Sequence, residues 1–89
     1  MNPVLSKLDP HLRKLLLSPP ERPIRVLVEI APDVDRASLR EAFQCAGAKI
    51  QSWSDQSRVV TLEIAAAGVG ELSAMPDVVY IEAAEPYTR

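Results

Sequence analysis

From Ile24 onward, apolar residues recur first at every second position and then at helical spacing, and this exchange repeats along the chain. "IRVLVEI" (24–30) alternates and predicts a strand. "DRASLREAFQCAG" (35–47) predicts a helix with Asp35 as its N-cap and Gly47 as its stop. Three more strands are predicted in "AKIQSW" (48–53), "RVVTLEI" (58–64) and "DVVYIEA" (77–83), and a second, short helix in "AAGVGELSAM" (66–75).

The resulting order of strand, helix, strand, strand, helix, strand is typical of the ferredoxin-like split βαβ arrangement. Right-handed crossovers put both helices on one face of a four-stranded antiparallel sheet. The sequence therefore predicts an α+β domain with βαββαβ topology over residues 24–84 and a C-terminal tail over residues 85–89. Nothing in the pattern predicts a pairing partner for Ala83 to Arg89.

The N-terminal stretch "KLDPHLRKLLLSPP" predicts an additional helix. Asp9 can act as the N-cap, and Pro10 fits the first helical position. The apolar residues on one face of this helix are Leu12, Leu15 and Leu16. We expect residues 1–23 to form a helix and a proline-rich linker that dock outside the main core.

One face of the predicted sheet has no helix over it. Alternation places on this face Arg25, Leu27, Glu29, Lys49, Gln51, Trp53, Val59, Thr61, Glu63, Val78, Tyr80 and Glu82. An apolar set of this size on a solvated face usually marks an interaction site. The alternative is that the N-terminal segment covers the face with Leu5, Leu8, Leu12, Leu15 and Leu16.

Composition narrows the function classes. The chain has 89 residues, enough for one domain. Its net charge of −2 gives no reason to expect nucleic acid or an anionic membrane as a partner, since both favour a basic face. No apolar run approaches the ~20 residues of a membrane span, and charged residues interrupt any signal sequence in residues 1–17. The lone Cys45 excludes an internal disulfide. Localisation stays open, between a cytoplasmic protein and an excised domain of an exported one.

Residues suited to catalysis or to metal binding are scarce. The single histidine, His11, lies on the predicted N-terminal helix, and Cys45 is expected to be a small, partly buried side chain with no basic neighbour to activate it. No CxxC motif or His/Cys cluster predicts a metal or another cofactor. The central strands lack the aromatic residues with which RNA-binding versions of this fold stack bases. We therefore expect a protein that is not an enzyme, carries no cofactor and binds no nucleic acid.

Three stretches, "KLDPHLRKLL", "AGAKIQSWSDQSRVVTLEI" and "LSAMPDVVYIEAAEPY", resemble the N-terminal prodomain of subtilisin-like serine proteases, which also occurs as a free-standing propeptide-type peptidase inhibitor (inhibitor I9 family). The resemblance covers nearly the whole chain. Its most specific part is the run from Leu72 to Glu82, which resembles the family pattern "L…P-x-V-x-Y-V/I-E".

The resemblance implies a non-catalytic inhibitor and intramolecular chaperone that docks its open sheet face on two surface helices of the protease. On this reading the docking face comprises Leu27, Trp53, Val59, Val78, Tyr80 and Glu82. Glu82 would cap a helix N-terminus of the protease, where a carboxylate is favourable. The second acidic residue that the family often has two positions later is Ala84 here, and Glu85 is the nearest substitute.

The family's tail runs through the substrate cleft as an added strand, and the matching residues here are Glu85, Pro86, Tyr87, Thr88 and Arg89. Counting from Glu82 without a gap places Tyr87 at the fourth subsite before the cut, where an aromatic ring suits the apolar pocket. A loop shorter by one residue instead makes Arg89 terminal and places Pro86 there. The gap-free register is preferred because it needs no deletion.

Two functional hypotheses follow. The first is inhibition and folding assistance of a subtilisin-like protease, in cis or in trans. The second is a regulatory or assembly module that dimerises through the open sheet face. A weaker third possibility is an isolated structural unit whose N-terminal helix closes the sheet.

Overall fold

The computed structural model describes residues 4–84. In chain order its elements are the 3-10 helix η1 (Leu5–Lys7), α1 (Pro10–Leu17), β1 (Ile24–Ile30), α2 (Arg36–Cys45), β2 (Lys49–Ser54), β3 (Val59–Ile64), the 3-10 helix η2 (Ala66–Gly68), α3 (Val69–Ser73) and β4 (Val78–Ala83).

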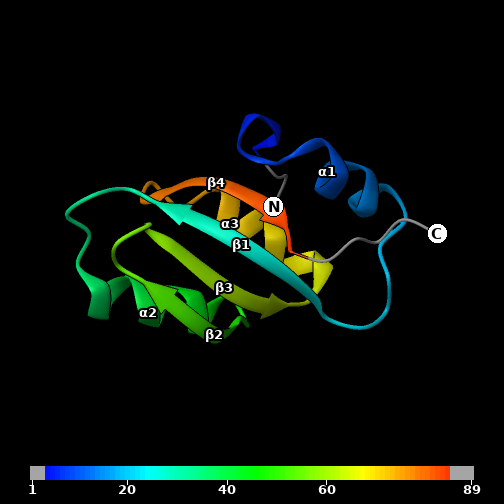
Figure 1. Ribbon diagram of the computed structural model, residues 1–89. Coiled ribbons are helices and arrows are strands. Elements are labelled where there is room, and N and C mark those ends of the chain that lie inside the picture. The colour runs from blue at the N-terminus through cyan, green and yellow to red at the C-terminus, as the bar shows by residue number, and fades with distance from the viewer. Residues whose placement is uncertain (1–3, 85–89) are drawn as a thin grey trace.

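The four strands form one antiparallel sheet in the order β2-β3-β1-β4. Both α2 and α3 lie behind this sheet, and α1 lies beyond the β4 edge (Figure 1). The predicted α+β ferredoxin-like fold with an extra N-terminal helix is confirmed. The bounds of β1 match the prediction, and the other three strands begin one residue later than predicted.

A side-chain cap explains where α2 begins. Asp35 precedes α2, and its Oδ1 accepts hydrogen bonds from the amides of Ala37 and Ser38. Ser38 Oγ also donates to Asp35 Oδ2 at 3.0 Å, and this side-chain bond is the main reason that the pKa of Asp35 lies below its ordinary value. After α2 the chain turns at Gly47 with a φ of 87°, a conformation that glycine adopts without strain.

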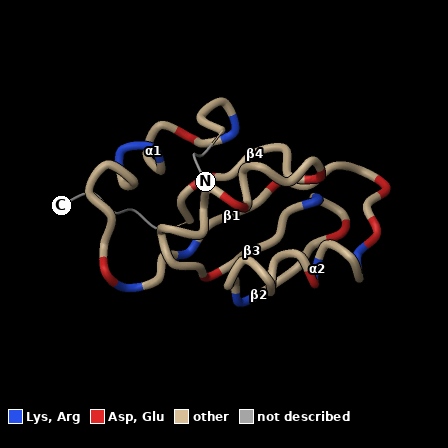
Figure 2. Tube along the Cα trace, turned by 180° about the vertical axis from the view of Figure 1, so that it is seen from behind, with Lys and Arg blue, Asp and Glu red and all other residues tan. Residues whose placement is uncertain are grey.

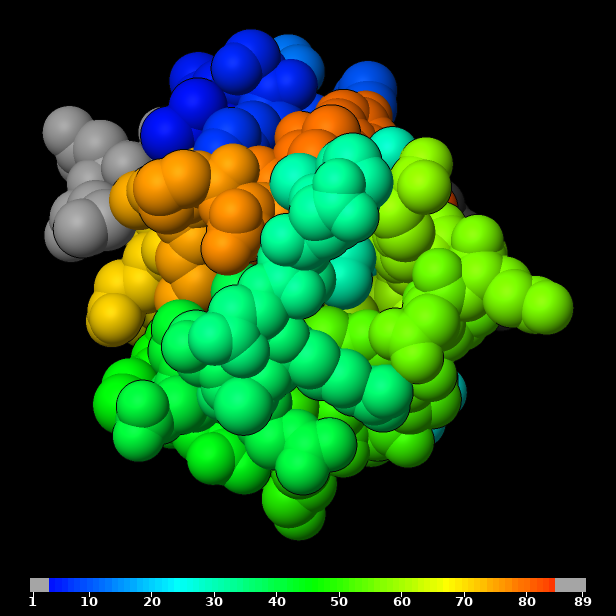
Figure 3. Space-filling model, turned by 90° about the vertical axis from the view of Figure 1, so that its left-hand side faces the viewer, coloured from blue at the N-terminus to red at the C-terminus, as the bar shows by residue number. Residues whose placement is uncertain are grey.

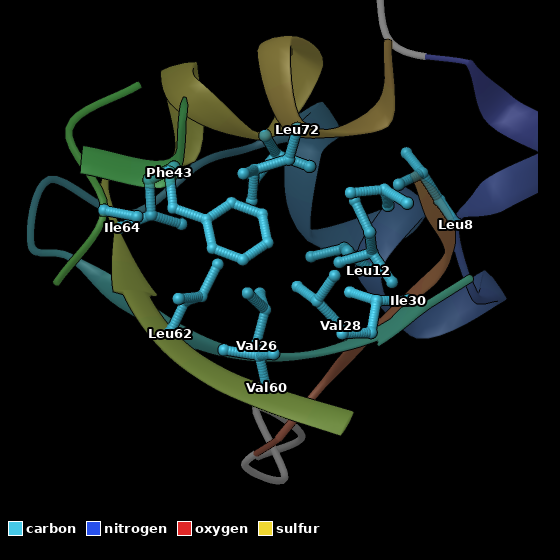
Figure 4. Close-up of a cluster of buried hydrophobic side chains, with 14 of the residues drawn as sticks. Leu8, Leu12, Val26, Val28, Ile30, Phe43, Val60, Leu62, Ile64 and Leu72 are labelled. Carbon is cyan, nitrogen blue, oxygen red and sulfur yellow. The ribbon is translucent and has the colours of Figure 1, made fainter. Parts of the chain in front are cut away.

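Apolar side chains from both helices, the sheet and the N-terminal segment form one buried cluster (Figure 4). Phe43 contributes the largest of these side chains, from α2. Leu8 and Leu12 are 0% exposed and belong to the same cluster, at the end away from Ile64. The expectation that residues 1–23 dock outside the main core is therefore wrong at Leu8 and Leu12, because these side chains complete the core beside β4.

The second predicted helix consists of a single 3-10 turn, η2, followed by the short α-helix α3. Gly68, between them, is buried, and a Cβ there would lie 2.7 Å from Ile64 Cδ1 and 3.0 Å from the Ala46 carbonyl oxygen. Glycine at this position therefore permits close packing of η2 on β3, which offsets its low helix propensity.

Each edge strand contains a one-residue bulge, and the bulge in β4 changes which residues face the core. Glu29 pairs with Tyr80, whereas the next residue, Ile30, pairs with Val78, so Val79 is the inserted residue. Val78 is 1% exposed and Val79 is 45% exposed. The prediction that Val78 belongs to the open sheet face is wrong because strict alternation does not allow for this insertion.

The bulge in β2 moves Trp53 in the same way. Ile50 pairs with Leu62, and Ser52 pairs with Thr61, which leaves Gln51 as the inserted residue. Trp53 consequently shares a face with the helices, and its ring lies 6.0 Å from that of Phe43 at an interplanar angle of 49°. The prediction that Trp53 belongs to the open sheet face is therefore wrong.

Candidate functional site

The sheet face opposite α2 and α3, called the open face from here on, faces the viewer in Figure 1. The strand register arranges its residues in three rows across the sheet. In the order β2, β3, β1, β4, these rows are Ser54, Val59, Glu29 and Tyr80; then Ser52, Thr61, Leu27 and Glu82; and then Lys49, Glu63 and Arg25. Leu27 lies in the middle row, on a central strand of the sheet.

The open face has a small apolar centre with charged residues around it. Leu27, Val59 and Tyr80 are all partly exposed, and they are the aliphatic and aromatic side chains of the face. The charged residues of the face are Glu29, Glu63 and Glu82, together with Arg25 and Lys49. Charges of both signs therefore surround the apolar centre.

Glu82 is exposed and is the last residue of β4 on the open face. It lies directly across from Leu27 of β1. The carboxylate is therefore next to the apolar centre, at the end of β4 from which the chain continues toward Glu85.

The N-terminal segment, residues 4–17, lies along the outer edge of β4 and does not extend over the open face (Figures 1 and 3). Leu8 forms a parallel bridge with Ile81, and the Asp9 amide donates to the Ile81 carbonyl oxygen at 3.0 Å. The alternative in which this segment covers the open face is wrong for these residues. Of the five leucines proposed to cover it, Leu8 and Leu12 are in the core and Leu5 is 56% exposed.

Further hydrogen bonds attach the N-terminal segment to α3 and to the turn that follows it. The Val4 amide donates to Ser73 Oγ at 2.8 Å, and Lys7 Nζ donates to the Met75 carbonyl oxygen at 3.0 Å. Ser73 is fully buried, and its hydroxyl also donates to the Gly70 carbonyl oxygen. The N-terminal segment is therefore hydrogen-bonded to β4, to α3 and to the turn after α3.

The end of β4 is held from both sides. Asp9 Oδ2 accepts a hydrogen bond from the Ala83 amide at 2.7 Å, and the Ala84 amide donates to the Arg25 carbonyl oxygen at 3.0 Å. The expectation that nothing pairs with the chain from Ala83 onward is therefore wrong for Ala83 and Ala84. The predicted tail residues, Glu85, Pro86, Tyr87, Thr88 and Arg89, lie outside the described residues, and their register in a cleft stays a prediction.

Trp53 belongs to a different surface, at the β2–β3 hairpin. The Arg36 guanidinium carbon lies 5.0 Å from the Trp53 ring centroid, and Arg36 Nη1 is 3.0 Å from Asp55 Oδ2. A hollow of about 260 Å³ separates this hairpin from the loop after β1 (Figure 3). Trp53 Nε1 is buried and has no hydrogen-bond partner among the described residues, and it does not reach the solvent in this hollow.

The single histidine and the single cysteine both lie at the surface of the part that the structure describes. His11 and Cys45 are both exposed, so the expectation that Cys45 is partly buried is wrong. Within these residues no group of three or more His, Cys, Asp or Glu side chains is placed to hold a metal ion, and no helix is long and apolar enough to cross a membrane. Figure 2 shows Lys and Arg interspersed with Asp and Glu along this part of the chain.

Comparisons of this chain with protein-family models, with curated proteins and with solved structures gave no match.

Proposed function

We propose that this domain is a prodomain-like inhibitor and folding assistant of a subtilisin-like serine protease, acting in cis or in trans without catalysis of its own. It docks through the open face and directs its C-terminal tail into the substrate cleft. The observation that carries the proposal is the open face itself: its apolar centre at Leu27 is uncovered by the described helices, while the N-terminal segment occupies the neighbouring edge. The resemblance of residues 72–82 to the protease prodomains adds the identity of the partner.

The side chains of the open face are suited to docking on helices of the protease. Leu27, Val59 and Tyr80 supply apolar area, and Glu82 supplies a carboxylate beside it. A carboxylate near a helix N-terminus is favourable by roughly 0.3–1 kcal/mol when exposed, and by more when it is partly buried. Two parallel helices on the protease would bury the apolar centre and present one such N-terminus to Glu82.

The way in which β4 ends supports insertion of the tail. Pairing with β1 continues as far as the Ala84 amide, and Pro86 follows two residues later. Proline has no amide hydrogen and favours extended backbone, so it opposes folding of the tail back into a helix. An extended segment is the form that adds as a strand to a cleft, with alternate side chains entering its subsites.

The completeness of the core supports a role in folding. The buried cluster is assembled from the domain's own elements, including Leu8 and Leu12 of the N-terminal segment. With its core assembled in this way, the open face would act as a template on which two protease helices pack.

The direct test is to mix the domain with a bacterial subtilisin and to follow hydrolysis of a chromogenic peptide. We expect competitive inhibition by the intact chain, a large loss on deletion of Pro86–Arg89, and a greater loss for Tyr87→Ala than for Thr88→Ala. The reason is that Tyr87 fills the apolar fourth subsite in the gap-free register. No inhibition by the intact chain, or full inhibition after the deletion, would contradict the proposal.

Sedimentation distinguishes this function from assembly through the same face. A stable homodimer at micromolar concentration that is unaffected by removal of the tail supports the regulatory or assembly module. A monomer that forms a one-to-one complex with the protease supports the inhibitor.

A further inference from the structure

Asp9 lies where the N-terminal segment, α1 and the end of β4 meet. Its Oδ1 accepts a hydrogen bond from the Leu12 amide at 2.9 Å and thereby caps α1. Its Oδ2 accepts from the Ala83 amide at 2.7 Å, across 74 positions of sequence. Its own amide donates to the Ile81 carbonyl oxygen. One residue therefore joins the start of α1 to the last residue of β4.

These contacts restrict the direction in which the chain leaves the sheet. The Ala83 amide points outward to Asp9, and the following amide, of Ala84, points inward to the Arg25 carbonyl oxygen. Two consecutive peptide units are thus held from opposite sides. The bond to Asp9 is the stronger kind, since a carboxylate accepting from a backbone amide is charge-assisted and short.

We infer that Asp9 is a positioning residue for the C-terminal tail, so that the N-terminal segment sets the direction in which residues 85–89 enter the protease cleft. This inference rests on the proposed function. Holding the end of β4 lowers the ordering cost that the tail would otherwise contribute on binding. Ser73 and Lys7 anchor the same segment to α3 and the turn after it, so Asp9 is itself held in place.

Asp9→Asn separates this role from helix capping. Asparagine is as good an N-cap as aspartate, so its side-chain oxygen retains the bond to the Leu12 amide. The second acceptor becomes an NH₂ group, which cannot accept from the Ala83 amide. Asp35→Asn is the matched control, because it makes the same change at the cap of α2, where the carboxylate accepts from Ala37 and Ser38 within the first turn of the helix.

The experiment measures inhibition constants against a bacterial subtilisin for the full chain, Asp9→Asn, Asp35→Asn, Tyr87→Ala and the double variant Asp9→Asn/Tyr87→Ala. We expect Asp9→Asn to weaken inhibition about tenfold, as loss of a hydrogen bond to a charged group does, and Asp35→Asn to leave it unchanged. Tyr87→Ala should cost less in the Asp9→Asn background than in the native one, because a misdirected tail no longer delivers Tyr87 to its subsite.

Amide exchange provides a readout that needs no protease. We expect the Ala83 amide to exchange faster in Asp9→Asn while the amides of β1 keep their native rates, which separates a local release of β4 from general destabilisation.

The possible results separate the positioning role of Asp9 from the proposed inhibition of the protease. If the intact chain does not inhibit the subtilisin, the proposed function is wrong. If the intact chain inhibits and Asp9→Asn inhibits equally well, only the assignment of Asp9 is overturned. Additive effects of Asp9→Asn and Tyr87→Ala overturn it too, since two independent losses do not indicate positioning of one by the other.

Discussion

At the scale of single residues, two inserted residues decide which side chains reach the open face. The apolar positions that face the core are Ile50 and Trp53 in β2 and Val78 and Ile81 in β4, a spacing of three in each strand. Period-two alternation is unable to produce that spacing, so it assigned Trp53 and Val78 to the wrong face. In β2 the polar residues between Ile50 and Trp53 make this three-residue interval visible in the sequence, whereas in β4 the continuous apolar run from Val78 to Ile81 hides it.

The bulge in β4 predicts opposite outcomes for two adjacent valines. Val78→Thr places a hydroxyl where the side chain is 1% exposed, and we expect a loss of about 1–3 kcal/mol in the free energy of unfolding. Val79→Thr changes a side chain that is 45% exposed and should alter stability by less than about 0.5 kcal/mol. Urea denaturation of both variants measures the difference, and the reverse ranking would contradict the observed register.

At the scale of elements, the sequence predicted which strands and α-helices exist, with β1 placed to the residue by alternation and the start of α2 placed by the Asp35 cap. The location of the N-terminal segment was not predictable in the same way. An apolar stripe indicates that a helix packs against other apolar residues, but it does not indicate whether these residues lie on a face or at an edge of the sheet. Here the edge is favoured because Leu8 and Asp9 also satisfy backbone groups of β4.

The edge position predicts that α1 contributes to the stability of the whole domain. Leu12→Ala removes a side chain that is 0% exposed, and we expect it to lower the free energy of unfolding by about 2–5 kcal/mol. Leu17→Ala, on the same helix at 86% exposure, is the control and should cost less than about 0.5 kcal/mol. Thermal unfolding of the two variants tests this, and a small effect of Leu12→Ala would mean that the segment is dispensable for the core.

At the scale of the whole molecule, the layered fold has one sheet face under α2 and α3, one edge under the N-terminal segment, and the open face uncovered by the described elements (Figure 1). The sequence correctly predicted four residues of this face, Leu27, Val59, Tyr80 and Glu82. The first two lie on the central strands β1 and β3, and the other two follow the inserted residue of β4, where alternation is regular. The partner itself was suggested by motif resemblance, which the fold neither requires nor opposes.

Binding of the protease by the open face can be measured as the inhibition constant of a Leu27→Lys variant against a bacterial subtilisin. Leu27 is partly exposed at the apolar centre, so a lysine there should leave folding intact and weaken inhibition at least about tenfold by burying a charge in the interface. Gln44→Lys, on the exposed side of α2, adds the same charge away from the open face and should inhibit like the native chain. An unchanged inhibition constant for a folded Leu27→Lys variant would contradict the account.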